Sequence, residues 1–81
     1  MNHTDTPNSR VRAIVAEVLA MNLDEIDDTA DLFNHYQADS LNLIEIVAQV
    51  ERQYRVVLPL NGLPRARSVS ALCDLLTQVA A

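Results

Sequence analysis

The sequence predicts a small all-α protein, a four-helix bundle with three main helices and a short, weak third helix. Three observations support this prediction. Apolar residues recur at helical spacing in three segments, and no two segments alternate as a pair of strands would. The 81 residues are 49 % apolar, which is enough for one small core without disulfides or metal. One domain is therefore expected.

The first predicted helix begins at Ser9, after a polar segment, residues 1–8, that we expect to be a flexible tail. Its apolar residues have the i, i+3, i+4, i+7, i+8 spacing of one helical face: Val11, Ile14, Val15, Val18 and Leu19. We expect this helix to end near Met21 and the folded domain to span residues 9–81.

The segment from Leu23 to Ala38 has no sustained period, which predicts a long loop. Apolar residues at intervals should hold this loop against the core: Leu23, Ile26, Leu32 and Phe33. A short turn of helix is expected around Asp31-Leu32-Phe33. Loops of this length in compact domains are usually functional or disordered.

The second main helix is predicted from Ser40 to Tyr54, with either Asp39 or Ser40 as its N-cap. Its core face consists of Leu43, Ile46, Val47, Val50 and Tyr54. An apolar strip lies on the flank beside the serine and suggests a docking surface: Leu41, Ile44 and Ala48. For Ile44 alone, a place in a wide core stripe is the favoured interpretation.

Extended chain is expected after the second helix, because Pro59 stops its continuation. Gly62 and Pro64 then allow at most a turn or two of helix between Leu60 and Arg67. Ser68 caps the last predicted helix, whose core face consists of Val69, Leu72, Cys73, Leu76, Val79 and Ala80. The central core residues of the whole bundle are predicted to be Val15, Leu19, Ile46, Val47, Val50, Leu72 and Leu76.

The net charge of −5 is unevenly distributed along the chain. Residues 22–45 carry seven acidic and no basic side chains, and this stretch flanks Ser40. It would repel phosphate backbones, so nucleic acid is not expected as a ligand. The acidic stretch could bind a basic protein partner, or it could simply be a solvated surface. We see no secretory signal and no bilayer-spanning run, which predicts a cytoplasmic protein without a membrane anchor.

Other candidate sites have weaker support. Cys73 lies on the buried face of the last helix and is expected to be a small core residue. His3 and His35 lack the spacing of metal ligands, so no metal site is predicted. Ser40, His35 and Asp31 can be assembled on paper as a hydrolase triad, but the glycine-rich turn of such a nucleophile is missing.

The ordered set of short motifs resembles the acyl carrier proteins of the phosphopantetheine-attachment family over about residues 9–80. The matching segments are Asp31-Leu32-Phe33, Ala38-Asp39-Ser40-Leu41, the helix to Tyr54, Val57-Leu58-Pro59 and Ser68-Val69. Each motif is short, but their order and spacing in a chain of this length are fairly specific.

The resemblance implies that Ser40 receives 4′-phosphopantetheine from coenzyme A through a phosphopantetheinyl transferase that uses Mg²⁺. The carrier itself is then not an enzyme: the arm ends in a thiol that presents acyl thioesters to acyl-loading and condensing enzymes. Asp39 resembles the family's acid before the serine, and Leu41 resembles the apolar residue that partners grip. A helix start also favours a phosphodiester on physical grounds, and a tether raises the effective concentration of its cargo.

The sequence departs from the family pattern at several positions. Gln37 stands where the family usually has Gly, so the loop is expected to avoid a glycine-only backbone conformation. Tyr36 replaces a customary Leu. Arg65 and Arg67 stand where acidic residues are common, which favours a dedicated carrier for a polyketide, a peptide or another specialised product.

We therefore predict a freestanding, monomeric carrier, with a general fatty-acid carrier as one alternative. The other alternative is an unmodified helical adaptor that kept the fold and lost the arm. The intact Asp39-Ser40-Leu41 favours the carrier, because an adaptor has no need of this hydroxyl. Partners are expected to dock on a surface made of Leu41, Ile44, Glu45, Ala48, Arg65 and Arg67.

Overall fold

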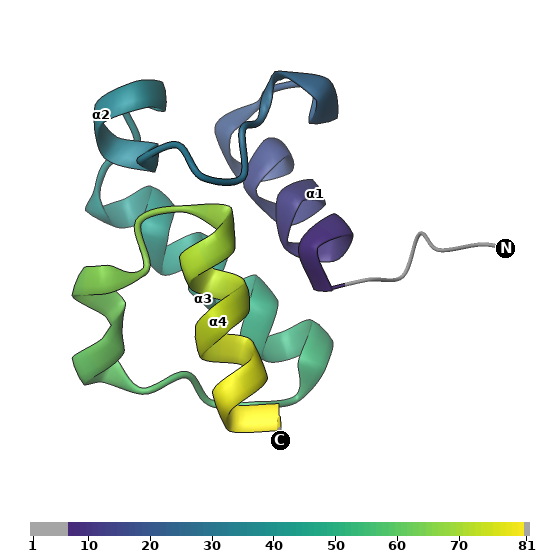
Figure 1. Ribbon diagram of the computed structural model, residues 1–81, viewed down its shortest axis with the longest axis vertical. Coiled ribbons are helices and arrows are strands. Elements are labelled where there is room, and N and C mark those ends of the chain that lie inside the picture. Colours follow the sequence, from purple (N-terminus) through teal and green to yellow (C-terminus); the bar gives the residue numbers. More distant parts are fainter. Residues whose placement is uncertain (1–6, 81) are drawn as a thin grey trace, which may run out of the picture.

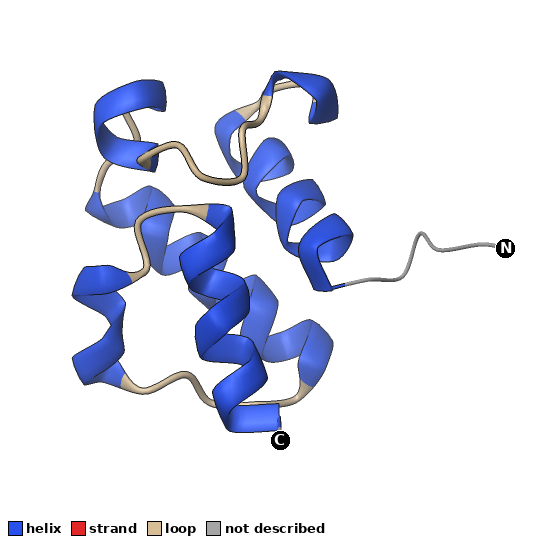
Figure 2. Cartoon of the chain, viewed as in Figure 1, coloured by secondary structure: helices blue, strands red, loops and turns tan. Residues whose placement is uncertain are grey.

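The computed structural model describes residues 7–80. They form four α-helices, α1 (Pro7–Leu19), α2 (Leu32–Tyr36), α3 (Ser40–Tyr54) and α4 (Val69–Ala80) (Figure 1). Two short 3-10 helices, η1 (Leu23–Glu25) and η2 (Leu60–Arg65), lie in the connections. Within this described range there is no strand (Figure 2). The prediction of an all-α bundle with three main helices is confirmed.

Helix α1 holds the bundle together, because it packs against both α3 and α4. Its side chains Val11 and Val15 are completely buried and belong to one core cluster with Ile46 and Val50 of α3 and Leu72 of α4. Every residue of the predicted central core is buried except Leu19, which is partly buried and packs against the cluster. The helical spacing of apolar residues therefore located the core.

Three helix ends carry a non-glycine residue in the left-handed conformation: Ala20, Gln37 and Arg55, with φ of 57°, 59° and 56°. At the end of α1 the chain reverses at Ala20, and the amide of Met21 donates to the carbonyl of Ala16 at 2.8 Å. Such 6→1 hydrogen bonds are typical of a helix terminated by a left-handed residue. This turn ends α1 at Leu19, slightly earlier than the predicted end near Met21. The helix begins at Pro7, two residues before the predicted start at Ser9, so residues 7 and 8 do not belong to a tail; the rest of the predicted tail, residues 1–6, lies outside the described residues.

The loop between α1 and α2 is fastened to the rest of the bundle. Arg12 of α1 donates from Nε and Nη2 to the two carboxylate oxygens of Asp28 at 2.8 and 2.7 Å. The carbonyl of Asp28 accepts from the amide of Ser70 in α4 at 2.9 Å, and Ile26 is buried in the core. The prediction that this loop is held against the core is confirmed for Ile26, Leu32 and Phe33, but it is wrong for Leu23, which is exposed in η1.

The closing helix begins as the sequence predicts, because Ser68 Oγ accepts from the amide of Ala71 at 3.1 Å. The preceding 3-10 helix lies close to it at Gly62, where a Cβ atom would stand 2.7 Å from Cδ2 of Leu75. A larger residue at that position would displace the leucine. Among residues 7–80, no helix is long and apolar enough to cross a membrane.

Candidate functional site

Ser40 is the first residue of α3, and Asp39 is its N-cap. The Asp39 carboxylate accepts from the amide of Asn42 at 2.9 Å, while the Asn42 side chain accepts from the amide of Asp39 at 3.0 Å. This capping box leaves the exposed Ser40 hydroxyl with no hydrogen bond to any described residue. The sequence alone allows either residue as the cap, and in the structure the cap is Asp39.

The position of Ser40 suits a negatively charged group. Amides in the first turn of a helix lack intrahelical partners, and the positive end of the helix macrodipole lies there. A phosphate ester on the exposed hydroxyl would therefore be stabilised by the chain's own backbone. The carboxylate of Asp39 already accepts from one of these amides, that of Asn42.

Gln37 ends α2 three residues before the serine and adopts φ 59° and ψ 33°. The amides of Gln37 and Ala38 both donate to the carbonyl of Leu32, and Ala38 is buried. The expectation that this loop avoids the conformation favoured by glycine is wrong. The residue adopts it because these hydrogen bonds and the buried neighbours outweigh the local strain of a left-handed side-chain-bearing residue.

Replacing Gln37 by glycine should stabilise the protein by about 0.5–1 kcal/mol, because relief of left-handed strain exceeds the extra entropy lost by glycine on folding. Urea denaturation measures the change. The matched control is Gln49→Gly inside α3, which should destabilise by about 1 kcal/mol. If Gln37→Gly were as destabilising as the control, Gln37 would carry no strain.

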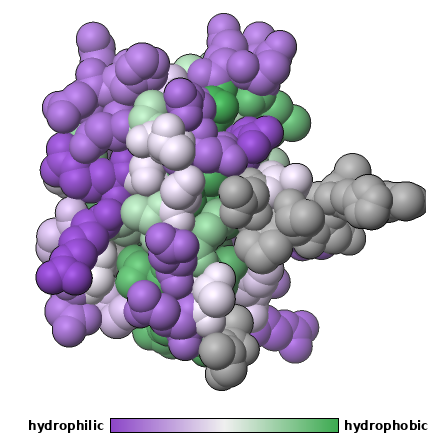
Figure 3. Space-filling model, in the orientation of Figure 1, coloured by the Kyte–Doolittle hydropathy of each residue, from purple (hydrophilic) through white to green (hydrophobic). Residues whose placement is uncertain are grey.

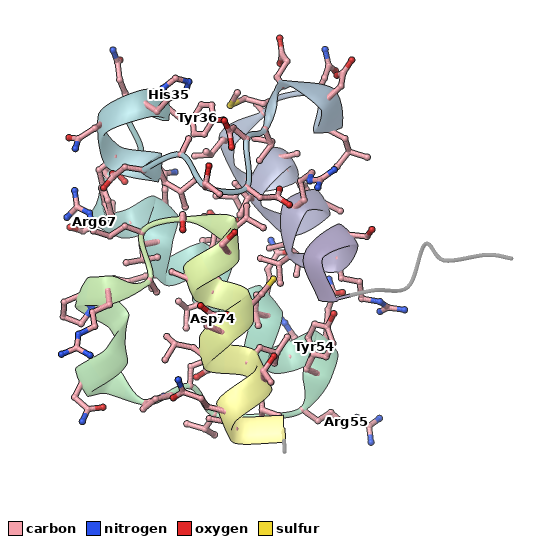
Figure 4. All side chains as sticks on the ribbon, in the orientation of Figure 1. His35, Tyr36, Tyr54, Arg55, Arg67 and Asp74 are labelled. Atoms are coloured by element: carbon pink, nitrogen blue, oxygen red, sulfur yellow. The ribbon has the colours of Figure 1, made fainter. Side chains whose placement is uncertain are left out.

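Tyr36, at the end of α2, contacts the acidic loop, by which we mean residues 22–31 between α1 and α2. Its hydroxyl accepts from the amide of Asp27 at 2.6 Å and lies 3.3 Å from the carbonyl of Glu25, to which it donates. The ring also meets that of His35 edge-on, with centroids 4.7 Å apart (Figure 4). A leucine at this position could pack but could not make these hydrogen bonds. No periodicity in the sequence predicts these hydrogen bonds, since they join an irregular loop to a five-residue helix.

Arg67 does not point freely into solvent. Its Nε donates to Oδ2 of Asp31 at 2.7 Å, its Nη2 donates to Oδ1 at 3.3 Å, and its guanidinium carbon lies 4.6 Å from the centre of the Phe33 ring. Asp31 is also the N-cap of α2, accepting from the amides of Phe33 and Asn34. The positive charge that the sequence suggested for docking is thus paired within the protein.

The Arg67 guanidinium, followed by the amide of Asn34, holds the pKa of Asp31 below its ordinary value of 3.8. On acidification the unfolded chain takes up a proton here before the folded protein does. The contribution of this carboxylate to the free energy of unfolding is therefore complete above about pH 4 and disappears as the pH falls through the lowered pKa.

Asp31→Asn, which keeps a capping oxygen, should therefore lose less stability than the wild type between about pH 6 and pH 3. Urea midpoints at both pH values test this. An unchanged difference would contradict the assignment.

The apolar strip on α3 is exposed. Leu41 is 74 % exposed, Ile44 is 61 % exposed, and Ala48 and the neighbouring Glu45 also face solvent. The interpretation of Ile44 as part of a wide core stripe is wrong. The core face of α3 centres on Ile46, Val47 and Val50, and Ile44 lies about 160° around the helix from Ile46. Solvent exposure of two large aliphatic side chains so close to Ser40 fits a contact surface.

Arg65 lies at the end of η2 and is exposed. It lines a groove of about 410 Å³ between η2 and α4, together with Asp74 and Gln78 of the closing helix. Asp74 projects from the front of α4 in Figure 4. On the same side of the molecule, hydrophilic residues cover most of the area around α2 and the acidic loop (Figure 3). Arg65 makes no ion pair with a described residue and remains available for a partner.

The other candidate chemistries find no support in the geometry. The oxygens of Asp31 accept from its own helix and from Arg67, which leaves no bond to His35 and no organised triad with Ser40. Burial raises the pKa of the Cys73 thiol to about 11, so it stays protonated at neutral pH. The prediction that Cys73 is a core residue is confirmed.

Comparison with known proteins identifies the family of this chain. Residues 9–76 match the family described as the phosphopantetheine attachment site. The chain is 32 % identical over 74 residues to the polyketide-8 synthase acyl carrier protein 2 of Streptomyces avermitilis, covering 91 % of this chain and 85 % of that protein. The chain therefore belongs to the phosphopantetheine-attachment family. It is an acyl carrier protein, and its cofactor is a covalently bound 4′-phosphopantetheine.

Proposed function

We propose that Ser40 is the residue that carries the phosphopantetheine arm. The single observation behind this proposal is the hydroxyl of Ser40 at the first position of α3, which is exposed and does not serve as the helix cap. In the transfer, the Ser40 oxygen forms a bond to the β-phosphorus of coenzyme A and the bond to adenosine 3′,5′-bisphosphate breaks. The hydroxyl proton leaves to a base of the transferase, and the new phosphodiester lies against the free amides of the helix start.

Asp39 has a supporting role in this proposal. Its carboxylate fixes the start of α3 through the capping box, which sets the direction of the Ser40 side chain. The same carboxylate lies next in sequence to the modified residue, where it can face the Mg²⁺ ion of a transferase. Carboxylate oxygens are preferred ligands of that ion.

The chain acts as a carrier and does not catalyse a reaction. When bound, the arm supplies a thiol that holds acyl groups as thioesters. The protein contributes an anchoring point and a surface that partners recognise, so a docked enzyme meets the tethered acyl group at a high effective concentration. We place this activity in the cytoplasm, in line with the single, unpaired cysteine.

We further propose that the pathway makes a polyketide. The support is the likeness to a carrier named for a polyketide synthase, together with the exposed Arg65 beside the groove between η2 and α4. A peptide or another specialised product is the second candidate, and a general fatty-acid carrier is the third. Rates of malonyl loading and condensation with a polyketide ketosynthase and with a fatty-acid ketosynthase distinguish the pathways.

The assignment of Ser40 is tested by incubating the unmodified protein with coenzyme A, Mg²⁺ and a broad-specificity phosphopantetheinyl transferase. Intact mass should increase by about 340 Da, the mass of one arm, and fragmentation should locate it on Ser40. A protein that folds normally but gains no mass would instead fit the unmodified adaptor. An arm on another serine would contradict the proposed site.

The docking surface is proposed to combine the apolar strip of α3 with the charges of Glu45 and Arg65. Replacing Leu41 by alanine should slow both arm loading and acyl transfer about three- to tenfold, because both partners use this contact. The matched control is Val57→Ala, which truncates a side chain that is 80 % exposed beyond the far end of α3. Equal effects of the two substitutions would show that Leu41 has no special role.

Arg65→Glu should impair the enzyme of the cognate pathway while leaving a broad-specificity transferase almost unaffected. Charges at the rim of an interface govern association and partner choice more than the strength of the complex. Association rates at low and high salt measure this effect. Equal impairment of both partners, or no impairment of the cognate enzyme, would refute a specialised basic surface at Arg65.

A further inference from the structure

We propose that Arg67 is a positioning residue, which holds α2 and thereby the surface that a transferase meets beside Ser40. This inference rests on the proposed modification of Ser40. It replaces the role in docking that the sequence suggested for Arg67. The contacts that carry it connect the segment before α4 with the segment before α3, and they lie between residues far apart in the chain.

Arg67 contacts α2 in three ways. Its guanidinium makes two hydrogen bonds to the Asp31 carboxylate, at 2.7 and 3.3 Å, and lies over the Phe33 ring at 4.6 Å. Its backbone carbonyl accepts from the amide of Leu32 at 2.6 Å. We call this set of contacts the Arg67 clasp. In Figure 4, Arg67 lies below α2, on the side of the molecule where α3 begins.

The clasp matters because α2 has only five residues, too few to be stable as an isolated helix. An exposed ion pair alone contributes little. Here the carboxylate also caps α2, and the guanidinium also stacks on a ring of the same helix. Side-chain and backbone contacts from one residue therefore act on the N-terminal turn of α2 together.

The effect is transmitted to Ser40 through Leu32. Its amide donates to the carbonyl of Arg67, and its own carbonyl accepts from the amides of Gln37 and Ala38. Residues 37 and 38 lead directly into the Asp39 cap. Gln37 is held in a strained, left-handed conformation. If α2 loosens, residues 37–39 should therefore relax to a different conformation. The clasp thus keeps residues 37–39 in the arrangement that flanks the serine.

A docking cation and a positioning residue respond differently to a double-mutant cycle. The variants are Arg67→Gln, Asp31→Asn and both together, and Asp31→Asn keeps an oxygen that can cap α2. Each single variant should lower the kcat/KM of arm loading about two- to fivefold, and the double variant should be no slower than either single one. Additive losses, or no loss in Arg67→Gln, would overturn the proposal.

A conservative substitution at Arg67 and a control that removes an equal charge elsewhere sharpen the test. Arg67→Lys keeps the charge but loses the planar pair of donors and their stacking, so it should restore loading only in part. Full restoration would indicate a simple docking charge. Arg52→Gln removes an equal charge from an exposed residue of α3 that is not part of the clasp, and loading by the same transferase should not change.

Amide hydrogen exchange tests the clasp without any enzyme. In Arg67→Gln, exchange of the Gln37 and Ala38 amides should accelerate, while the amides of Val47 and Val50 in α3 should not change. A uniform acceleration would indicate general destabilisation and contradict positioning. If the wild type were not loaded on Ser40, the proposed function would fail, whereas unaltered exchange at Gln37 and Ala38 would refute the clasp itself.

Discussion

Replacing Ser40 by alanine is expected to abolish arm loading while leaving the protein folded. The mass increase of about 340 Da seen with coenzyme A and a transferase should disappear completely, since no other group replaces the lost oxygen nucleophile. Because Asp39 provides the cap, the helical circular dichroism spectrum and the urea midpoint should remain close to those of the wild type. This is the largest functional effect that we expect from a single substitution.

The matched control for this experiment is Ser70→Ala. Ser70 is another serine in the first turn of a main helix, but its side chain is half-buried at the start of α4. This variant should be loaded at the wild-type rate. A residual mass increase in Ser40→Ala, or its loss in Ser70→Ala, would contradict the assignment of the arm to Ser40.

The largest effect on stability is expected from Leu72→Ala. Leu72 is completely buried in the core cluster that joins α1, α3 and α4. Its truncation should lower the free energy of unfolding by about 2–5 kcal/mol, through lost apolar burial and the cavity left behind. For a domain of this size such a loss is a large part of the total stability. Urea denaturation measures this loss of free energy, and the m-value should not change.

The same substitution at Leu23 provides the control. This leucine is 52 % exposed in η1, so its truncation should change the unfolding free energy by less than about 0.5 kcal/mol. Equal losses at the two positions would show that the burial pattern does not govern stability. A loss at Leu23 alone would contradict the helical phase assigned to α4.

The sequence predicted the main helices well, because their apolar spacing is a direct record of which face is buried. The bounds of α3, Ser40–Tyr54, agree with the prediction, and so does the cap of α4 at Ser68. Ile44 shows the limit of this reasoning. An aliphatic residue beside the core face of a helix gives the same pattern in the sequence whether its side chain is buried or, as here, exposed.

The contacts around α2 could not be predicted in the same way. The pairing of Asp31 with Arg67 joins residues 36 apart, and the hydrogen bond from the Asp27 amide to the Tyr36 hydroxyl joins an irregular loop to a five-residue helix. Neither follows from a local period. The prediction for Gln37 is wrong because the absence of glycine does not exclude a left-handed turn. Non-glycine residues adopt that turn where surrounding contacts compensate for it.

The packing of α1 against both α3 and α4 has a consequence for the order of events during synthesis. Val11 and Val15 are synthesised early, whereas Leu72, in the same core cluster, is synthesised much later. Until α4 has left the ribosome, the first helix lacks part of its apolar cover. Domain closure therefore waits for the C-terminal helix, and a nascent chain stalled before residue 69 exposes aggregation-prone surface rather than a partly working carrier.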